Sequence, residues 1–124
     1  FFAYPGVSDF FGDDAKKYYY GHLESAIRFL PYGCPVDEFQ HLVYENPTWT
    51  PAERNAAWKS LEAEYLPHLD YSDHPSLDKG IYWQSQLHIF GMPFYYIDYC
   101  LAQIGAFQFW LKDEADHEKA WVDY

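Results

Sequence analysis

The chain has 124 residues, with 8 Lys and Arg against 19 Asp and Glu, and a formal net charge of −11 at pH 7. This acidity argues against binding to nucleic acids or to anionic membrane surfaces, which attract basic proteins. The length fits one domain or a piece of one, and a hydrophobic content of 49% suffices for a core. Aromatic residues reach 23%, which indicates a large interface or a cleft with aromatic walls.

The N-terminus and the cysteines bear on the origin of the chain. It begins FFAYPG and its only methionine is Met92, so we expect a fragment or a processed product of something longer. Cys34 and Cys100 have no metal-type spacing and suggest no disulfide framework. No signal peptide is evident, and Asp98 with two glutamines weakens a membrane-span reading of residues 91–111. A reducing cytoplasm is the expected compartment.

The first part of the chain predicts irregular structure followed by two helices. Residues 1–13 are aromatic and rich in turn formers, so we expect them to pack irregularly on a neighbour. Residues 15–30 carry a helical stripe of apolar side chains, which Pro31 and Gly33 are expected to end. A second helix is predicted over residues 36–45, opened by a proline and stopped by another.

The next part starts with the strongest local signal in the sequence. Thr50-Pro51-Ala52-Glu53 is a capping box with proline at the first helical position, and it predicts a helix that reaches about residue 66. Residues 67–79 are rich in turn formers and are predicted to form a loop. Residues 80–90 have helical periodicity and predict a further helix.

The least polar stretch follows at Gly91. Over residues 94–111 only Asp98 and two glutamines are neither apolar, aromatic nor glycine, which predicts a buried central helix with Pro93 in its first turn. A buried, unpaired Asp98 would be costly, so this helix should face a polar network or a site. A short polar helix is expected over residues 114–122. No strand pattern occurs, so the class is all-α, with about five to six helices in a single segment, residues 1–124.

A polar stripe on the central helix is a candidate site. Tyr96, Tyr99 and Gln103 are spaced three and four apart, so they share one helical face. His88 lies just before the break at residues 91–93, which can aim its imidazole and the tyrosines into one space. Tyrosine hydroxyls are donors at neutral pH, and a donor aimed at a developing oxyanion contributes roughly 2.7–4 kcal/mol. The alternative is a core helix with satisfied tyrosines and a histidine bonded to a backbone carbonyl.

Other chemistries have weaker signals. Two E-x-x-H pairs and two further glutamates could build a di-metal carboxylate bundle; the residues are Glu38, His41, Glu114, His117, Glu24 and Glu62. Acidic residues at a helix start or in a solvated run explain the same pattern. The zinc motif H-E-x-x-H is absent, so this chain alone cannot make that site. No G-x-S-x-G motif occurs, and neither cysteine has a recognisable nucleophile setting.

Two runs carry a resemblance to a known family. Trp83-Gln84-Ser85-Gln86-Leu87-His88-Ile89-Phe90 and Pro93-Phe94-Tyr95-Tyr96-Ile97-Asp98-Tyr99 resemble the C-terminal part of oligoendopeptidase F. Those enzymes belong to the thimet oligopeptidase-like zinc metallopeptidases. Residues 36–41, 44–47 and 50–54 are similar to the same subfamily, and the resemblance extends over residues 10–110.

The resemblance implies a large all-α catalytic domain with a deep channel that admits short peptides and excludes folded proteins. It implies a zinc ion in the full-length enzyme, held by the two histidines of H-E-x-x-H and a later glutamate, all upstream of this chain. No metal is expected within the chain itself. By the same resemblance, His88 and Tyr95 would bind substrate, while Tyr96 and Tyr99 would be the catalytic hydrogen-bond donors. The choice of oxyanion donor among the three tyrosines stays open.

The sequence therefore predicts the C-terminal portion of an oligoendopeptidase F-like zinc metalloendopeptidase that cleaves short oligopeptides. This segment would line the substrate channel, and it is not expected to be active by itself. Its expected partners are short peptides and the upstream part of the same peptidase, and exposed aromatic surface would favour self-association. The alternative is a non-catalytic helical module that binds peptides or a partner subunit.

Overall fold

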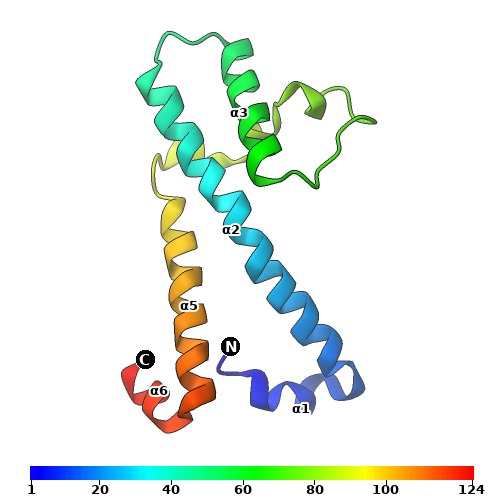
Figure 1. Cartoon of the computed structure of the whole chain (residues 1–124), viewed down its shortest axis with the longest axis vertical. Coiled ribbons are helices and arrows are strands. Elements are labelled where there is room, and N and C mark those ends of the chain that lie inside the picture. The colour runs from blue at the N-terminus through cyan, green and yellow to red at the C-terminus, as the bar shows by residue number, and fades with distance from the viewer. The chain divides into compact units, whose positions relative to one another are not determined.

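A computed structural model describes all 124 residues, and every regular element in it is helical. The α-helices are α1 (Val7–Phe11), α2 (Ala15–Glu45), α3 (Pro51–Tyr65), α4 (Leu87–Gly91), α5 (Ile97–Ala115) and α6 (His117–Asp123) (Figure 1). Short 3₁₀ helices are η1 (Tyr4–Gly6), η2 (Gly12–Asp14), η3 (Leu77–Lys79) and η4 (Tyr82–Ser85). The all-α prediction is confirmed. No helix combines the length and the apolar character needed to cross a membrane.

The chain forms two compact units. The terminal unit contains Phe1–Phe29 and Leu101–Tyr124, and the central unit contains Leu30–Cys100. Helices α2 and α5 each contribute residues to both units. The expectation of a single segment over residues 1–124 stays a prediction.

The predicted break in the first long helix is wrong. Helix α2 continues without interruption from Ala15 to Glu45, with Pro31 and Pro35 inside it. Each internal proline removes a helical N–H donor and is unfavourable by about 3 kcal/mol or more. The residues around Pro35 are among the most deeply buried of the chain; they are Pro35, Val36, Phe39 and Gln40. Burial of this face outweighs the local preference for a break.

The core of the central unit is built around Phe39 of α2 and Trp58 of α3. Their exposed fractions are 1% and 0%, and their rings meet edge to face with centroids 5.4 Å apart. Phe39 also contacts Trp83, at a centroid separation of 5.0 Å. Aromatic pairs of this kind contribute roughly 0.5–1.5 kcal/mol beyond the burial of their area. This cluster holds α3 and the η4 segment against α2.

The loop before η4 approaches α3 closely at one glycine. Gly80 has φ of +74°, and a Cβ atom there would overlap the backbone carbonyl of Asn55. Only glycine combines this backbone conformation with the missing side chain. Asn55 also accepts a hydrogen bond from the indole nitrogen of Trp83, at 3.0 Å. Gly80 and Trp83 therefore both hold this segment against Asn55 of α3.

The predicted helix over residues 80–90 is in fact two short pieces. The 3₁₀ turn η4 and helix α4 are separated by Gln86, whose backbone is extended with φ −86° and ψ 92°. The helical periodicity of the segment did not reveal this interruption. The side chain of Gln86 bonds to Tyr32 of α2 and to His88 of α4.

The prediction of a buried central helix also needs correction. Helix α5 begins at Ile97, so Pro93 lies in the preceding turn and not in the helix. Cys100 is its only buried residue, and Asp98 is exposed, so no buried carboxylate has to be satisfied there. Several large apolar side chains of α5 are also exposed, among them Leu101, Ile104 and Leu111.

The terminal unit is held together by aromatic rings. Phe1 stacks on Trp110 with centroids 4.9 Å apart, and Phe2 meets Trp121 and Tyr124 edge to face. The first residues, expected to be irregular, form the helical turns η1, α1 and η2. Helix α6 is capped by Asp116, whose carboxylate accepts from the Lys119 backbone N–H.

The capping box at the start of α3 is confirmed and gives a first stability prediction. The Thr50 hydroxyl accepts from the Glu53 backbone N–H, and the Glu53 carboxylate accepts from the Thr50 N–H at 2.7 Å. Thr50→Ala should lower the free energy of unfolding by about 1 kcal/mol, because the Glu53 backbone N–H at the start of α3 loses its side-chain acceptor. Urea denaturation of the chain measures this change. Thr48→Ala, on the exposed loop nearby, is the matched control, and equal losses for both variants would contradict the capping role.

Buried Glu62 gives a second, pH-dependent prediction. Its exposed fraction is 5%, and this burial raises the pKa of the carboxyl above its ordinary value, although the neighbouring Trp58, Tyr71 and Lys59 offset part of the effect. The folded chain then holds the proton more tightly than the unfolded chain, so stability falls as pH rises through the folded pKa. Glu62→Gln should raise the thermal midpoint at pH 7 but not at pH 3.5. Thermal unfolding of the wild type and of Glu62→Gln at both pH values measures this difference, and Glu64→Gln, at an exposed position, is the control. An unchanged thermal midpoint of Glu62→Gln at pH 7 would contradict the prediction.

Candidate functional site

The residues singled out as a candidate site come together in the central unit. His88 lies on α4, Tyr95 and Tyr96 on the turn before α5, and Tyr99 on the first turn of that helix. The His88 ring is 5.1 Å from the Tyr96 ring and 5.7 Å from the Tyr99 ring, measured between centroids. Tyr99 lies 5.4 Å from Tyr95 and 5.3 Å from Tyr96. One imidazole and three phenol rings therefore form a continuous cluster.

A chain of hydrogen bonds orients the histidine. The Tyr32 hydroxyl donates to Gln86 Oε1 at 2.8 Å, which turns the amide nitrogen of Gln86 toward His88. That nitrogen lies 2.6 Å from His88 Nδ1. An amide NH₂ only donates, so Nδ1 accepts and the neutral imidazole carries its proton on Nε2. Nε2 lies 3.5 Å from the Tyr99 hydroxyl, at the long limit of a hydrogen bond.

This tautomer leaves the Tyr99 proton available. Because His88 Nε2–H is a donor, the Tyr99 oxygen is its acceptor, and the phenolic proton can point to a third group. Tyr95 and Tyr99 are each 40% exposed, so a ligand can reach both rings. The cluster can thus present hydroxyl donors to a carbonyl oxygen in solution.

Burial keeps the inner tyrosines protonated. Tyr96 is 9% exposed, and burial is the main cause that raises the pKa of its hydroxyl, followed by the neighbouring Cys100 and Tyr99. Burial likewise raises the pKa of Tyr32 well above its ordinary range, with Tyr96 as the next contributor. Both phenols remain hydrogen-bond donors throughout the neutral range.

Cys100 is poorly suited to act as a nucleophile. Cys34 and Cys100 are free thiols, and burial raises the pKa of the Cys100 thiol to about 11, assisted by Cys34 next to it. A thiol of that pKa is protonated at neutral pH and is a poor nucleophile.

The side chains proposed for a di-metal centre are engaged elsewhere. In the central unit, Glu38 accepts from the Tyr65 hydroxyl at 2.7 Å, while His41 pairs with Asp37 at 3.3 Å. The bond to Glu38 is the main cause that raises the pKa of Tyr65 to about 12.

In the second E-x-x-H pair, in the terminal unit, the histidine and the glutamate also bond to other side chains. His117 pairs with Asp113 at 2.6 Å, and Glu114 accepts from the Trp110 indole at 3.2 Å. No cluster of three or more His, Cys, Asp or Glu side chains in the structure could hold a metal ion. The di-metal hypothesis therefore has no support.

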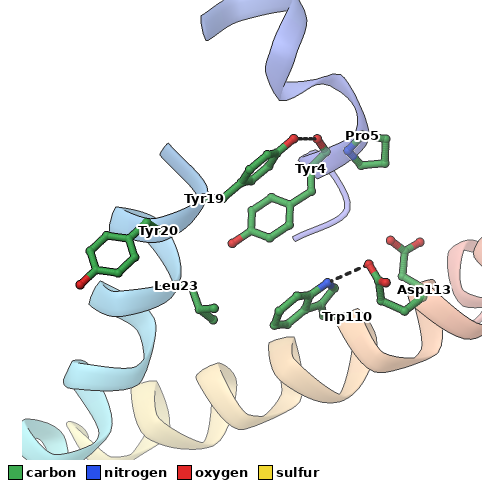
Figure 2. A pocket seen from close by; sticks show the side chains of 8 residues that line it. Tyr4, Pro5, Tyr19, Tyr20, Leu23, Trp110 and Asp113 are labelled. Atoms are coloured by element: carbon green, nitrogen blue, oxygen red, sulfur yellow. Dashed lines mark hydrogen bonds between the residues drawn. The ribbon is translucent and has the colours of Figure 1, made fainter. Parts of the chain in front are cut away.

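A separate cavity of about 480 Å³ lies in the terminal unit (Figure 2). Its walls are Tyr4, Pro5, Tyr19, Tyr20, Leu23, Trp110, Asp113 and Glu114. The Tyr19 hydroxyl donates to the Tyr4 carbonyl at 2.7 Å, and the Tyr4 hydroxyl bonds to His22 Nδ1 at 2.7 Å. None of the candidate site residues lines this cavity.

Sequence reasoning missed Tyr32 and Gln86, which orient His88, and Gln40, which bonds to the turn before α5. Tyr32 and Gln86 are 54 residues apart in sequence, and so are Gln40 and Phe94. A contact between such distant residues leaves no periodic signal in one sequence. Gln86 belongs to the run of residues 83–90 that carries the family resemblance, and this was the only indication of its importance.

Comparison with known proteins places the chain. No family model matches it, and no curated protein matches it. Solved structures do match over 100% of the chain. One is a 3.1 Å X-ray structure of a candidate oligoendopeptidase F, with 56% identity and a TM-score of 0.94. Another is a PZ peptidase A with an inhibitor, with 53% identity and a TM-score of 0.94.

A third match is a candidate oligoendopeptidase F from Bacillus anthracis str. Ames, with 47% identity and a TM-score of 0.75. The chain spans 22% of the length of each of the first two proteins and 19% of the third. The resemblance noted in the sequence is therefore confirmed. The chain is similar over its whole length to oligoendopeptidase F structures and corresponds to about a fifth of such a protein, consistent with a C-terminal segment.

Proposed function

We propose that this chain is the C-terminal part of a zinc metallopeptidase that hydrolyses peptide bonds in short oligopeptides, and that it lines part of the substrate channel. The observation that carries this proposal is the identity of 53–56% to peptidase structures over the whole chain. One of those proteins, PZ peptidase A, was solved with an inhibitor. The cluster of one histidine and three tyrosines supports a peptide-binding role, because it offers several donors on one partly exposed surface.

The four candidate residues divide into two roles. His88 and Tyr95 hold the backbone of the peptide, with Nε2–H of His88 as a donor to a substrate carbonyl. Tyr96 and Tyr99 donate hydrogen bonds to the oxygen that becomes negative as water adds to the scissile carbonyl. Such donors stabilise the transition state more than the bound substrate, because the charge on that oxygen develops during the reaction.

The metal must come from elsewhere in the protein. The residues of this chain do not fit a zinc site, since they contain no H-E-x-x-H motif and form no cluster of three ligands. We propose that residues outside this chain hold the zinc, so the isolated chain is inactive. Its two free thiols are in keeping with a reducing compartment, and the cytoplasm is our proposed location.

The exposed apolar face of α5 is proposed to pack against the remainder of the same peptidase. Leu101, Ile104 and Leu111 are 61%, 43% and 69% exposed in this chain. A globular protein seldom leaves so many large side chains of one helix in water unless a partner covers them. The isolated chain should consequently self-associate through the same residues.

The tyrosines give a kinetic prediction in the full-length peptidase that carries this segment. Removing the donor to the oxyanion, by Tyr96→Phe or Tyr99→Phe, should lower kcat by about 10²–10³-fold with little change in KM, because the lost bond forms mainly in the transition state. Hydrolysis of a short fluorogenic peptide measures both constants. Whichever of the two variants shows the loss identifies the donor.

Tyr20→Phe is the matched control, since this tyrosine is 71% exposed and lies outside the cluster. It should leave both constants unchanged. If neither Tyr96→Phe nor Tyr99→Phe lowers kcat beyond this control, the tyrosines have no catalytic role.

His88 gives a different kinetic pattern. Its imidazole binds a substrate carbonyl and also fixes Tyr99, so His88→Ala should raise KM and lower kcat, each by roughly tenfold, which is about the worth of one hydrogen bond. The same peptide assay separates the two effects. Unchanged kcat and KM in this variant would show that His88 has only a structural role.

A further inference from the structure

The turn between α4 and α5 contains an unfavourable backbone conformation. Phe94 has φ of +63°, and no other residue except glycine has a positive φ. Bulky L-residues avoid this left-handed region, because the Cβ atom comes too close to the backbone. Such a conformation persists only when surrounding contacts enforce it, and it is often found at functional sites.

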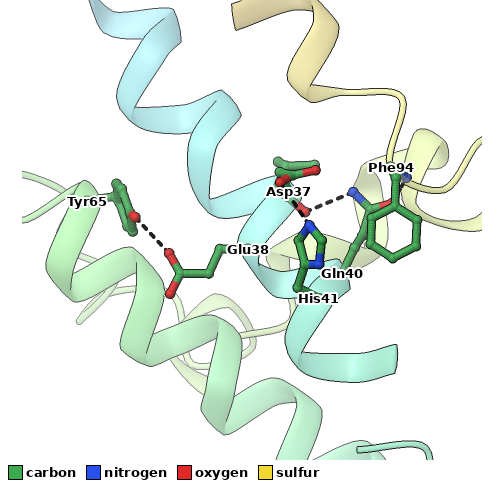
Figure 3. A network of polar contacts seen from close by, with 7 residues as sticks. Asp37, Glu38, Gln40, His41, Tyr65 and Phe94 are labelled. Atoms are coloured by element: carbon green, nitrogen blue, oxygen red, sulfur yellow. Dashed lines mark hydrogen bonds and ion pairs between the residues drawn. The ribbon is translucent and has the colours of Figure 1, made fainter. Parts of the chain in front are cut away.

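A buried glutamine of α2 holds this turn. Gln40 Oε1 accepts a hydrogen bond from the Phe94 backbone N–H at 2.8 Å, while its Nε2 donates to the Val36 carbonyl at 3.0 Å (Figure 3). The exposed fraction of Gln40 is 1%, so its carboxamide is shielded from water. Both ends of the carboxamide are satisfied, which fixes its orientation and directs the oxygen to Phe94.

The ring of Phe94 is anchored to the same helix. It lies 4.8 Å from the His41 ring and 4.9 Å from the Tyr44 ring, measured between centroids. His41 is in turn paired with Asp37 one helical turn earlier. Backbone and side chain of Phe94 are therefore both attached to α2, and its dihedral angles cannot change independently of that helix.

The position of Phe94 determines where the site tyrosines lie. Tyr95 and Tyr96 follow it directly, and Tyr99 is joined to the same turn by its backbone bond to the Tyr96 carbonyl at 3.2 Å. His88 is attached to α2 separately, through Gln86 and Tyr32. The relative placement of imidazole and tyrosines thus depends on two attachments to one helix, and Gln40 makes the second.

We propose that Gln40 is a positioning residue for peptide hydrolysis: by accepting from the Phe94 N–H, it holds the left-handed turn that sets Tyr96 and Tyr99 against His88. This inference rests on the proposed function of the tyrosines. Gln40 itself touches no substrate. Its removal should leave the fold intact and displace the donors by a small distance, which affects the transition state more than substrate binding.

The test uses the full-length peptidase. Gln40→Met keeps the shape of the side chain but removes the acceptor, and it should lower kcat roughly 10- to 100-fold with KM nearly unchanged, as expected for misplaced donors. Phe39→Leu, adjacent on α2 and equally buried, has no bond to the turn and should lower the melting temperature without lowering kcat.

Amide hydrogen exchange provides a second readout that does not depend on activity. Exchange of the peptide segment that contains Phe94 should be faster in Gln40→Met than in the wild type, whereas Phe39→Leu should not show this local change. Faster exchange at Phe94 together with the loss of kcat supports the proposal. A loss of kcat without faster exchange at Phe94 overturns it, because the effect then has another origin.

The kinetic outcomes separate this inference from the proposed function. If Gln40→Met keeps the wild-type kcat while Tyr96→Phe or Tyr99→Phe loses it, Gln40 is structural only and the tyrosine roles stand. A fall in kcat that Phe39→Leu reproduces also overturns the positioning role. If the tyrosine variants and Gln40→Met all retain the wild-type kcat, both the proposed function and this inference fail.

Discussion

The central unit depends on helix α2 running unbroken through Pro31 and Pro35. Two prolines would ordinarily end or kink a helix, so their tolerance requires compensation from tertiary packing. That compensation is the burial of the helix face around Pro35, which packs through Phe39 onto Trp58. The same helix then serves as the common support for the candidate site. Tyr32 holds the Gln86–His88 arm, and Gln40 holds the turn that leads to the tyrosines.

Sequence reasoning succeeded where the physical determinant is local. The capping box of Thr50 and Glu53 is complete within four residues, so the start of α3 could be located correctly. The break expected at Pro31 was wrong for the opposite reason. A proline disfavours helix locally, but the burial that outweighs it comes from α3 and from the segment after residue 80, and no short window contains those contacts.

The candidate site likewise combines local features that the sequence predicts with distant contacts that it does not. His88, Tyr96 and Tyr99 lie within one short segment, so a helix break followed by helical spacing was enough to predict that they meet. Their supports were not predictable, because Gln40 and Tyr32 are on α2 and contact residues 54 positions away. A buried glutamine in a helix has no distinctive pattern. Only the fold reveals that its oxygen is the acceptor for a left-handed residue beside the tyrosines.

The apparent failure of the buried-helix prediction for α5 supports the wider proposal. The sequence of α5 has the composition of a core helix, yet Leu101 and Leu111 are mostly exposed in this chain. A chain that spans 22% of related proteins lacks most of the elements that could cover such a helix. Under the proposed function, this composition reflects packing against the remainder of a larger peptidase. Under the proposed function, the same argument accounts for a candidate site that has donors but no metal ligands, because the remainder of the peptidase would supply those ligands.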